Sequence, residues 1–139
     1  MIQKNEQQSQ ELEFPFLTDE NHIYRLLEEK GYTGVELGWE HLAFELHANL
    51  KDDEKPVDGM CHFGEGKMLL DMGLSDRTAR ETIIHEIMHC HLESLAFHEA
   101  NFDGDAFYAT NEQFTLAMSR QQLQFNFMNP GLLSLLYDF

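Results

Sequence analysis

The chain has 139 residues, of which 42% are hydrophobic, and a formal net charge of −16 from 25 acidic and 9 basic residues. This length and apolar content allow one domain with a real core and exclude wholesale disorder. The negative charge disfavours direct binding to nucleic acid or anionic membranes and favours a basic protein partner. The alternative is that the acids, which are dispersed along the chain, only keep the domain soluble.

The polar, Gln-rich residues 1–12 are predicted to form a flexible N-terminal arm, and residues 13–139 a single domain. No apolar signal-peptide core follows the arm, and no run of 18 apolar residues occurs, so a cytoplasmic location and no membrane association are expected. Cys61 and Cys90 lack a CxxC spacing and are expected to be thiols, with Cys90 in the core.

A first helix is predicted over residues 20–30, capped by Thr18 or Asp19 and stopped by Gly31. One face of this helix would be apolar, formed by Ile23, Leu26 and Leu27.

Strand-forming residues follow the first helix. A strand is predicted over residues 33–37, and residues 39–50 fit strand or helix, with strand favoured. Residues 51–55 form a charged loop that ends at a proline. Residues 59–72, with a Gly-Glu-Gly turn, are typical of a hairpin.

Two long helices complete the pattern. The first is predicted from Ser75, its cap, to Glu99, and its expected buried face comprises Ile84, Met88, Leu92 and Leu95. After a turn at 101–105, the second begins at Thr110 or Asn111 and ends before the Asn-Pro-Gly at 129–131, and an apolar tail forms a short helical turn. The fold class is therefore α+β, with helices on one side of a small sheet.

The most specific motif is His85-Glu86-Ile87-Met88-His89 within the first long helix. Histidines four residues apart lie one turn from each other, so both imidazoles reach one metal ion. A glutamate after the first histidine can take a proton from an activated water molecule. The alternative is a buried helix with two hydrogen-bonded core histidines and an accidental glutamate.

A catalytic zinc ion needs a third protein ligand, for which Glu112 is the candidate. Glu112 lies in the first turn of the last helix and shares a stripe with Leu116, Leu123 and Phe127. A carboxylate on a core-facing stripe needs a partner, and a metal ion is sufficient. The alternative is a helix N-terminal acid stabilised by the macrodipole.

Other candidate ligands fit less well. His91 faces away from His89, and Glu93 lies two turns from His85. Loop positions leave three further candidates open, which are His98, Asp103 and Asp105. The metzincin pattern is excluded, because Leu92 and Leu95 occupy its glycine and third-histidine positions.

From the hairpin to about residue 133, the chain resembles small gluzincin-like metallopeptidases of the ImmA/IrrE kind, and especially stand-alone zincin-like proteins of phages and prophages. The resemblance rests on the HExxH helix and the later helix that opens with Asn111-Glu112. It implies a zincin-like fold, zinc held by His85, His89 and Glu112, and Glu86 as the general base. It also implies a phage or prophage origin, with the host cytoplasm as location.

Peptide hydrolysis also needs a donor for the oxyanion, and the candidates are Tyr108, His62 and His98. Asp71 or Glu81 are candidates to hold the second nitrogen of a ligand histidine. The favoured hypothesis is a zinc metallopeptidase that acts on a specific protein or peptide. Two alternatives are a catalytically silent zinc-binding interaction module and an acidic inhibitor that imitates nucleic acid and binds a basic host protein.

Overall fold

The computed structural model describes the backbone of residues 3–4, 19–99 and 111–138, and the side chains of residues 19–95 and 115–138. It is a mixed α+β arrangement, as predicted. In chain order the elements are β1 (Gln3–Lys4), α3 (Ile23–Glu29), β2 (Gly34–Glu36), β3 (His41–His47), β4 (Lys51–Asp52), β5 (Lys55–Pro56), β6 (Gly59–His62), β7 (Lys67–Asp71), α4 (Asp76–Glu99), α6 (Asn111–Met128) and α7 (Leu132–Tyr137).

β3 is the central strand of the sheet. Its first edge pairs with β7 in parallel, and its second edge is shared by β1, which is parallel, and β2, which is antiparallel. β6 pairs with β7 in an antiparallel hairpin and ends the sheet. The strands predicted at 33–37, 39–50 and 59–72 are thus confirmed. Within the expected arm, Gln3–Lys4 form β1, and within the charged loop β4 and β5 form a two-residue ladder.

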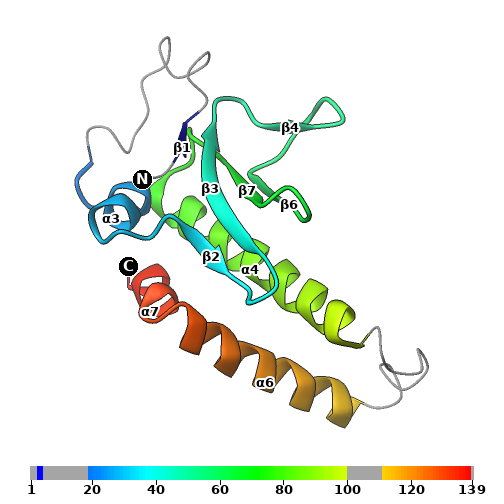
Figure 1. The fold of residues 1–139 in the computed structure, drawn as a ribbon. Helices are drawn as coiled ribbons and strands as arrows, with labels where there is room; N and C mark the ends of the chain where they lie inside the picture. Colours follow the sequence, from blue (N-terminus) through cyan, green and yellow to red (C-terminus); the bar gives the residue numbers. More distant parts are fainter. Residues whose placement is uncertain (1–2, 5–18, 100–110, 139) are drawn as a thin grey trace.

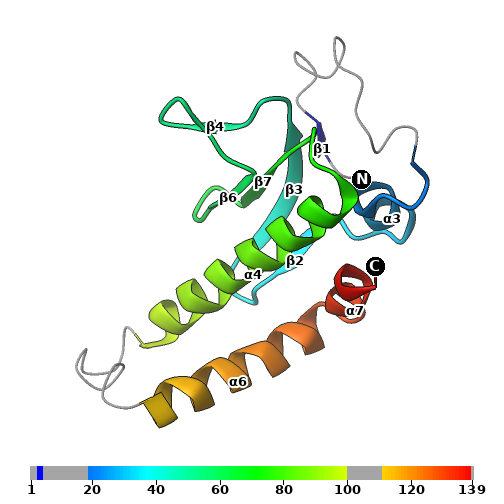
Figure 2. The same ribbon diagram turned by 180° about the vertical axis from the view of Figure 1, so that it is seen from behind.

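α4 lies between the two other layers of the molecule. One face of the sheet packs on it, and α6 and α7 pack on its other side (Figures 1 and 2). The shared core is built from the inner faces of the sheet, α3, α4, α6 and α7, and its largest fully buried side chains include Tyr24, Phe44, Met68, Ile83 and Phe125. This double coverage fixes which face of α4 is left for solvent.

The predicted bounds of α4 are confirmed, but its predicted buried face is wrong. Met88 is 46% exposed and Leu92 42% exposed, Ile84 is half-buried, and only Leu95 of the expected set is buried. The buried face instead comprises Ala79, Ile83, Ile87 and Cys90. Both sets follow the helical period, so periodicity alone could not choose between them. The burial of Cys90 is confirmed.

The predicted inward stripe of α6 is also wrong. Leu123 is 72% and Phe127 87% exposed, and Leu116 is half exposed. The side that meets α4 carries Phe125 and the polar Gln121, both buried. Phe125 lies about 180° from Leu116 on the helix, so the apolar stripe faces outward.

Of the predicted ends of α3 and α6, only the start of α3 differs from the structure. α3 begins at Ile23, later than predicted, because the cap is His22: its ring accepts from the Tyr24 N–H at 3.1 Å. Gly31, with a φ of 80°, follows the end of α3 as predicted. α6 ends at Met128, and the tail forms the short helix α7.

Candidate metal centre

The helix that carries the motif is anchored at its start. Ser75 Oγ accepts from the Thr78 N–H at 3.3 Å, which confirms Ser75 as the cap. One turn on, Arg80 donates through Nε to both Asp76 carboxylate oxygens, at 3.0 and 3.1 Å. Because Asp76 also accepts from the Ile23 N–H at 2.7 Å, the first turn of α4 is tied to α3. The motif therefore lies on a helix, α4, whose first turn is held in place by these hydrogen bonds.

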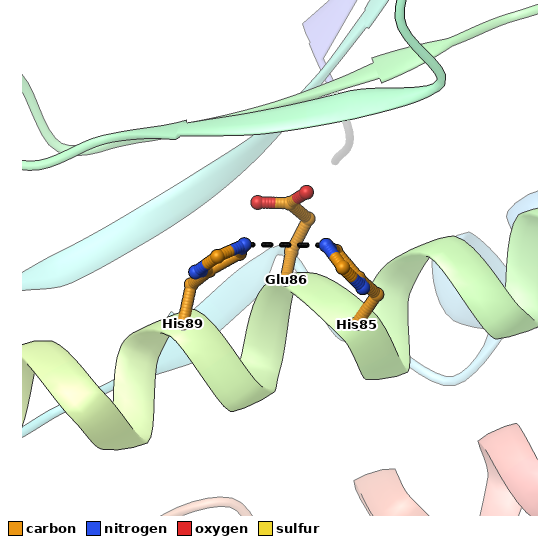
Figure 3. A group of neighbouring side chains, drawn as sticks. All are labelled: His85, Glu86 and His89. Carbon is orange, nitrogen blue, oxygen red and sulfur yellow. Dashed lines mark hydrogen bonds between the residues drawn. The ribbon is translucent and has the colours of Figure 1, made fainter.

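The two motif histidines face each other on the exposed side of α4 (Figure 3). Their Nε2 atoms are 3.2 Å apart, and the ring planes meet at 79°. Two nitrogens at about 2.0–2.1 Å from a tetrahedral zinc ion lie about 3.3 Å apart, so the observed separation fits shared coordination. His85, Glu86 and His89 place their ligand atoms within 4.8 Å of one another, and this group can hold a metal ion.

Glu86 differs from the histidines because it is buried, with only 5% of the residue exposed. Its carboxylate rises between the two imidazoles toward the strands of the sheet (Figure 3). None of the ion pairs among the described residues involves Glu86. A carboxylate in this position, not neutralised by a basic side chain of the described residues, can act as a general base toward a water molecule beside the imidazoles.

Across the layer, Glu86 contacts Cys61 on β6. The Cys61 thiol donates to the Glu86 carbonyl at 3.7 Å and lies 3.8 Å from the Cys90 sulfur. The contact with Cys90, burial and the Glu86 carboxylate all raise the pKa of Cys61. Cys61 therefore stays a neutral thiol and packs β6 against the motif without adding charge.

A groove runs between α4 and β6 on both sides of the motif. One hollow of about 400 Å³ extends from His85 and Glu86 toward Asp58, Thr78 and Glu81. A second hollow of about 400 Å³ extends from His85 and Glu86 in the other direction. Its lining includes Phe63, His89, Leu92 and Glu93. Both hollows include Gly59. The motif thus lies at the middle of an open groove.

Gly59 is needed for this close approach of strand and helix. A Cβ at position 59 would lie 2.7 Å from the Thr82 methyl carbon and 3.2 Å from the Leu69 carbonyl oxygen. Real Cβ atoms essentially never lie as close as 2.7 Å to another heavy atom, so one of the two must shift. A side chain at position 59 would therefore require Thr82 or β6 to shift beside the groove.

The proposed third ligand, Glu112, lies in the first turn of α6, and its side chain is outside the described residues. The premise that its stripe faces the core is wrong, because Leu116, Leu123 and Phe127 are exposed. The assignment of Glu112 to the metal therefore stays a prediction without that support.

The structure separates His62 from the motif. Neighbouring side chains of a strand alternate between faces, so His62 points to the opposite side of β6 from Cys61. There its Nδ1 lies 3.0 Å from Glu65 and its Nε2 3.0 Å from the Met60 sulfur. It lines a hollow on that face together with His47. His62 is thus not brought to the oxyanion position that the sequence suggested.

The two predicted partners of the ligand histidines are engaged elsewhere. Asp71 accepts from the N–H groups of Leu50, at 2.9 Å, and Gly73, at 3.1 Å. Glu81 pairs with Arg77 at 3.1 Å on the exposed side of α4. These carboxylates organise a turn and a helix surface, so they are not seen to orient His85 or His89.

Among the competing ligands, Glu93 is exposed and lines the groove, and His91 is buried under α6. The His91 ring packs edge-on against Phe125, its Nδ1 has no hydrogen-bond partner in the described structure, and burial lowers its pKa. The side chains of the remaining candidates lie outside the described residues: His98, Asp103, Asp105 and Tyr108.

Sequence reasoning missed the roles of Gly59 and Cys61. Gly59 opens the hairpin strand, where a glycine can mark close backbone approach, and that signal was available. Nothing in the sequence indicated that Cys61 meets Cys90 and Glu86, because this contact depends on how the hairpin folds back on α4.

Comparison with known proteins adds no family assignment: no protein-family model, curated protein or solved structure matches this chain. The part of the chain that the structure describes contains no helix long and apolar enough to cross a membrane. The local geometry of the metal centre is therefore the basis for a functional proposal.

Proposed function

We propose that this protein is a zinc-dependent metallopeptidase that acts on a specific protein or peptide substrate. The observation that carries the proposal is the pairing of two exposed imidazoles, 3.2 Å apart, with a buried carboxylate between them. This combination separates the metal-binding groups from the proton acceptor on one rigid helix. The resemblance of the HExxH helix to that of phage-encoded zincins is consistent with this proposal.

The roles of the residues follow from their chemistry. His85 and His89 would hold the ion, with Glu112 the candidate for the third ligand. Zinc, when bound, supplies a Lewis acid that lowers the pKa of water to near neutrality. Glu86 would take up the proton and pass it to the leaving amine.

The groove favours an extended peptide over a compact substrate. β6 is the last strand of the sheet, and its outer edge pairs with no strand of the described structure. A free edge offers backbone donors and acceptors that an extended chain can use as an added strand. The hollows on both sides of His85 and Glu86 would then accommodate residues before and after the scissile bond.

The first test is the zinc content of the purified protein, measured by elemental analysis. We expect about one zinc ion per chain in the wild type, as in a mononuclear catalytic site, and loss of zinc in His85→Ala. His62→Ala, on the far side of β6, is the matched control and should keep the metal. Zinc that survives His85→Ala would contradict the site. Zinc that is lost in Glu112→Ala would establish the third ligand, and zinc that is retained would exclude it.

The second test compares wild type with Glu86→Gln on a peptide library read by mass spectrometry. Loss of the proton acceptor should slow cleavage by about 10²–10⁴-fold while zinc remains bound. Zinc binding without cleavage of peptides or of candidate protein partners would point to a catalytically silent binding module and overturn the peptidase proposal.

A further inference from the structure

α6 presents apolar side chains on two opposite faces. Phe125, on the α4 side, is fully buried. On the other side, Leu116, Leu123 and Phe127 lie within about 40° of one another around the helix, and they are 50%, 72% and 87% exposed. We call these three residues the outer stripe. A helix with apolar rows on two opposite faces is typical of one that is covered on both sides, yet the described residues cover only one.

The outer stripe lies at the margin of the fold. Figures 1 and 2 show α6 beside α4, with no other described element on its far side. Exposed aromatic and leucine side chains that share one face of a helix mark an interaction surface more often than scattered single residues do. The motif histidines lie away from this surface, because His85 and His89 face the groove at β6.

The charge distribution indicates what covers this stripe. Although the chain carries 25 acidic residues, none occurs from Gln113 to Tyr137, where Arg120 is the one charged residue. An even distribution would place about four acids in a stretch of this length. From Leu116 on, the outer face of α6 is therefore a surface that a second, strongly acidic molecule can approach without meeting a carboxylate of this stretch.

We propose that the outer stripe is a self-association surface, on which α6 of one molecule packs against α6 of a second copy. A basic partner would gain most at the acidic faces, which places it elsewhere on the molecule. A second copy brings a matching apolar row, and a two-fold arrangement satisfies both molecules with the same residues. The helix is about 27 Å long, so the interface is small and the dimer should dissociate at micromolar concentrations.

Self-association is tested by sedimentation equilibrium of the full chain, without added metal, from about 5 to 500 µM protein, a range chosen for interfaces of this size. We expect a reversible monomer–dimer equilibrium in the wild type and a monomer in Leu123→Glu/Phe127→Glu. The control is Gln122→Glu/Asn126→Glu, which adds the same charge to exposed positions of the same helix about 80–120° away from the stripe. The control should keep the dimer, with a dissociation constant raised by less than about threefold through added repulsion.

The dependence of dimer formation on ionic strength distinguishes this apolar contact from association driven by charge. Because the two copies repel each other, raising the ionic strength from about 0.05 to 0.5 M should strengthen the dimer by several fold. A wild type that is monomeric throughout, a dimer that survives the stripe substitutions, or a dimer that salt dissolves would each overturn the proposal. If the glutamate pair impairs folding by circular dichroism, Leu123→Ser/Phe127→Ser gives the same test without added charge.

Discussion

The two long helices use their faces in opposite ways. α4 has partners on two sides, and it buries Ile83, Ile87 and Cys90 while the imidazoles of its metal motif reach the open groove. α6 has one described neighbouring layer, and it buries Gln121 and Phe125 while its outer stripe remains in solvent.

This difference shows that exposure has a different meaning on each helix. The exposed motif histidines of α4 are polar and converge on one point, which is typical of a site. The outer stripe of α6 is apolar and follows the helix axis, which is typical of an interface. Both helices are periodic, so coverage by neighbouring elements, rather than pattern strength, decides which side carries function.

The largest contrast should come from two phenylalanines of α6. Phe125→Ala removes a fully buried ring and should lower the free energy of unfolding by about 3–5 kcal/mol. Phe127→Ala, two positions away and 87% exposed, should change it by less than about 0.5 kcal/mol. Urea unfolding at low protein concentration, where any dimer is dissociated, measures both. Equal losses would show that the outer stripe is packed within the monomer.

Arg80 tests how α4 holds the C-terminal helix. Its guanidinium is nearly buried, pairs with Asp76 and donates to the carbonyl oxygens of Leu135, at 2.6 Å, and Asp138, at 2.8 Å. Arg80→Met would leave a carboxylate and two carbonyls short of a donor, and should cost about 3 kcal/mol in urea unfolding. The control is Arg77→Met, because that guanidinium is exposed, and it should cost less than about 1 kcal/mol.

Zinc should stabilise the exposed side of α4 when it binds. At a free zinc concentration about 100 times the dissociation constant, the free energy of unfolding should rise by about 2.7 kcal/mol, seen as a higher melting temperature. His85→Ala should abolish this rise, whereas His62→Ala, on the far face of β6, should retain it. An equal rise in both variants would place zinc binding away from the motif.

The smallest expected effect concerns two buried histidines. His91→Leu removes a ring whose Nδ1 has no partner, so the variant should be neutral or more stable by up to about 1 kcal/mol. His22→Leu is the matched control: that ring is equally buried, but its nitrogens bond to the Tyr24 N–H and the Leu74 carbonyl oxygen. It should lose about 1–3 kcal/mol. Similar changes in thermal unfolding of the two variants would contradict this assignment.

The sequence by itself determined the local elements and the chemistry of the motif. The strand at residues 33–37, the hairpin, the bounds of α4 and the end of α6 follow from turn residues, caps and period, which act over a few positions. Residues 39–50 fitted strand or helix, and the pairing of β3 with β7 decided for a strand. The convergence of His85 and His89 follows in the same way, because their spacing alone places them one turn apart on a helix.

Only the tertiary structure decided which way each helix faces. Ile84, Met88 and Leu92 have the same period as the true core face of α4, and the outer stripe of α6 reads as a core stripe, so composition could not separate them. The same limit applies to His62, Cys61 and Gly59, whose roles depend on which side of β6 meets α4. The burial of Glu86 beside two exposed histidines likewise arises from the sheet that lies above it, because burial depends on neighbours distant in the chain.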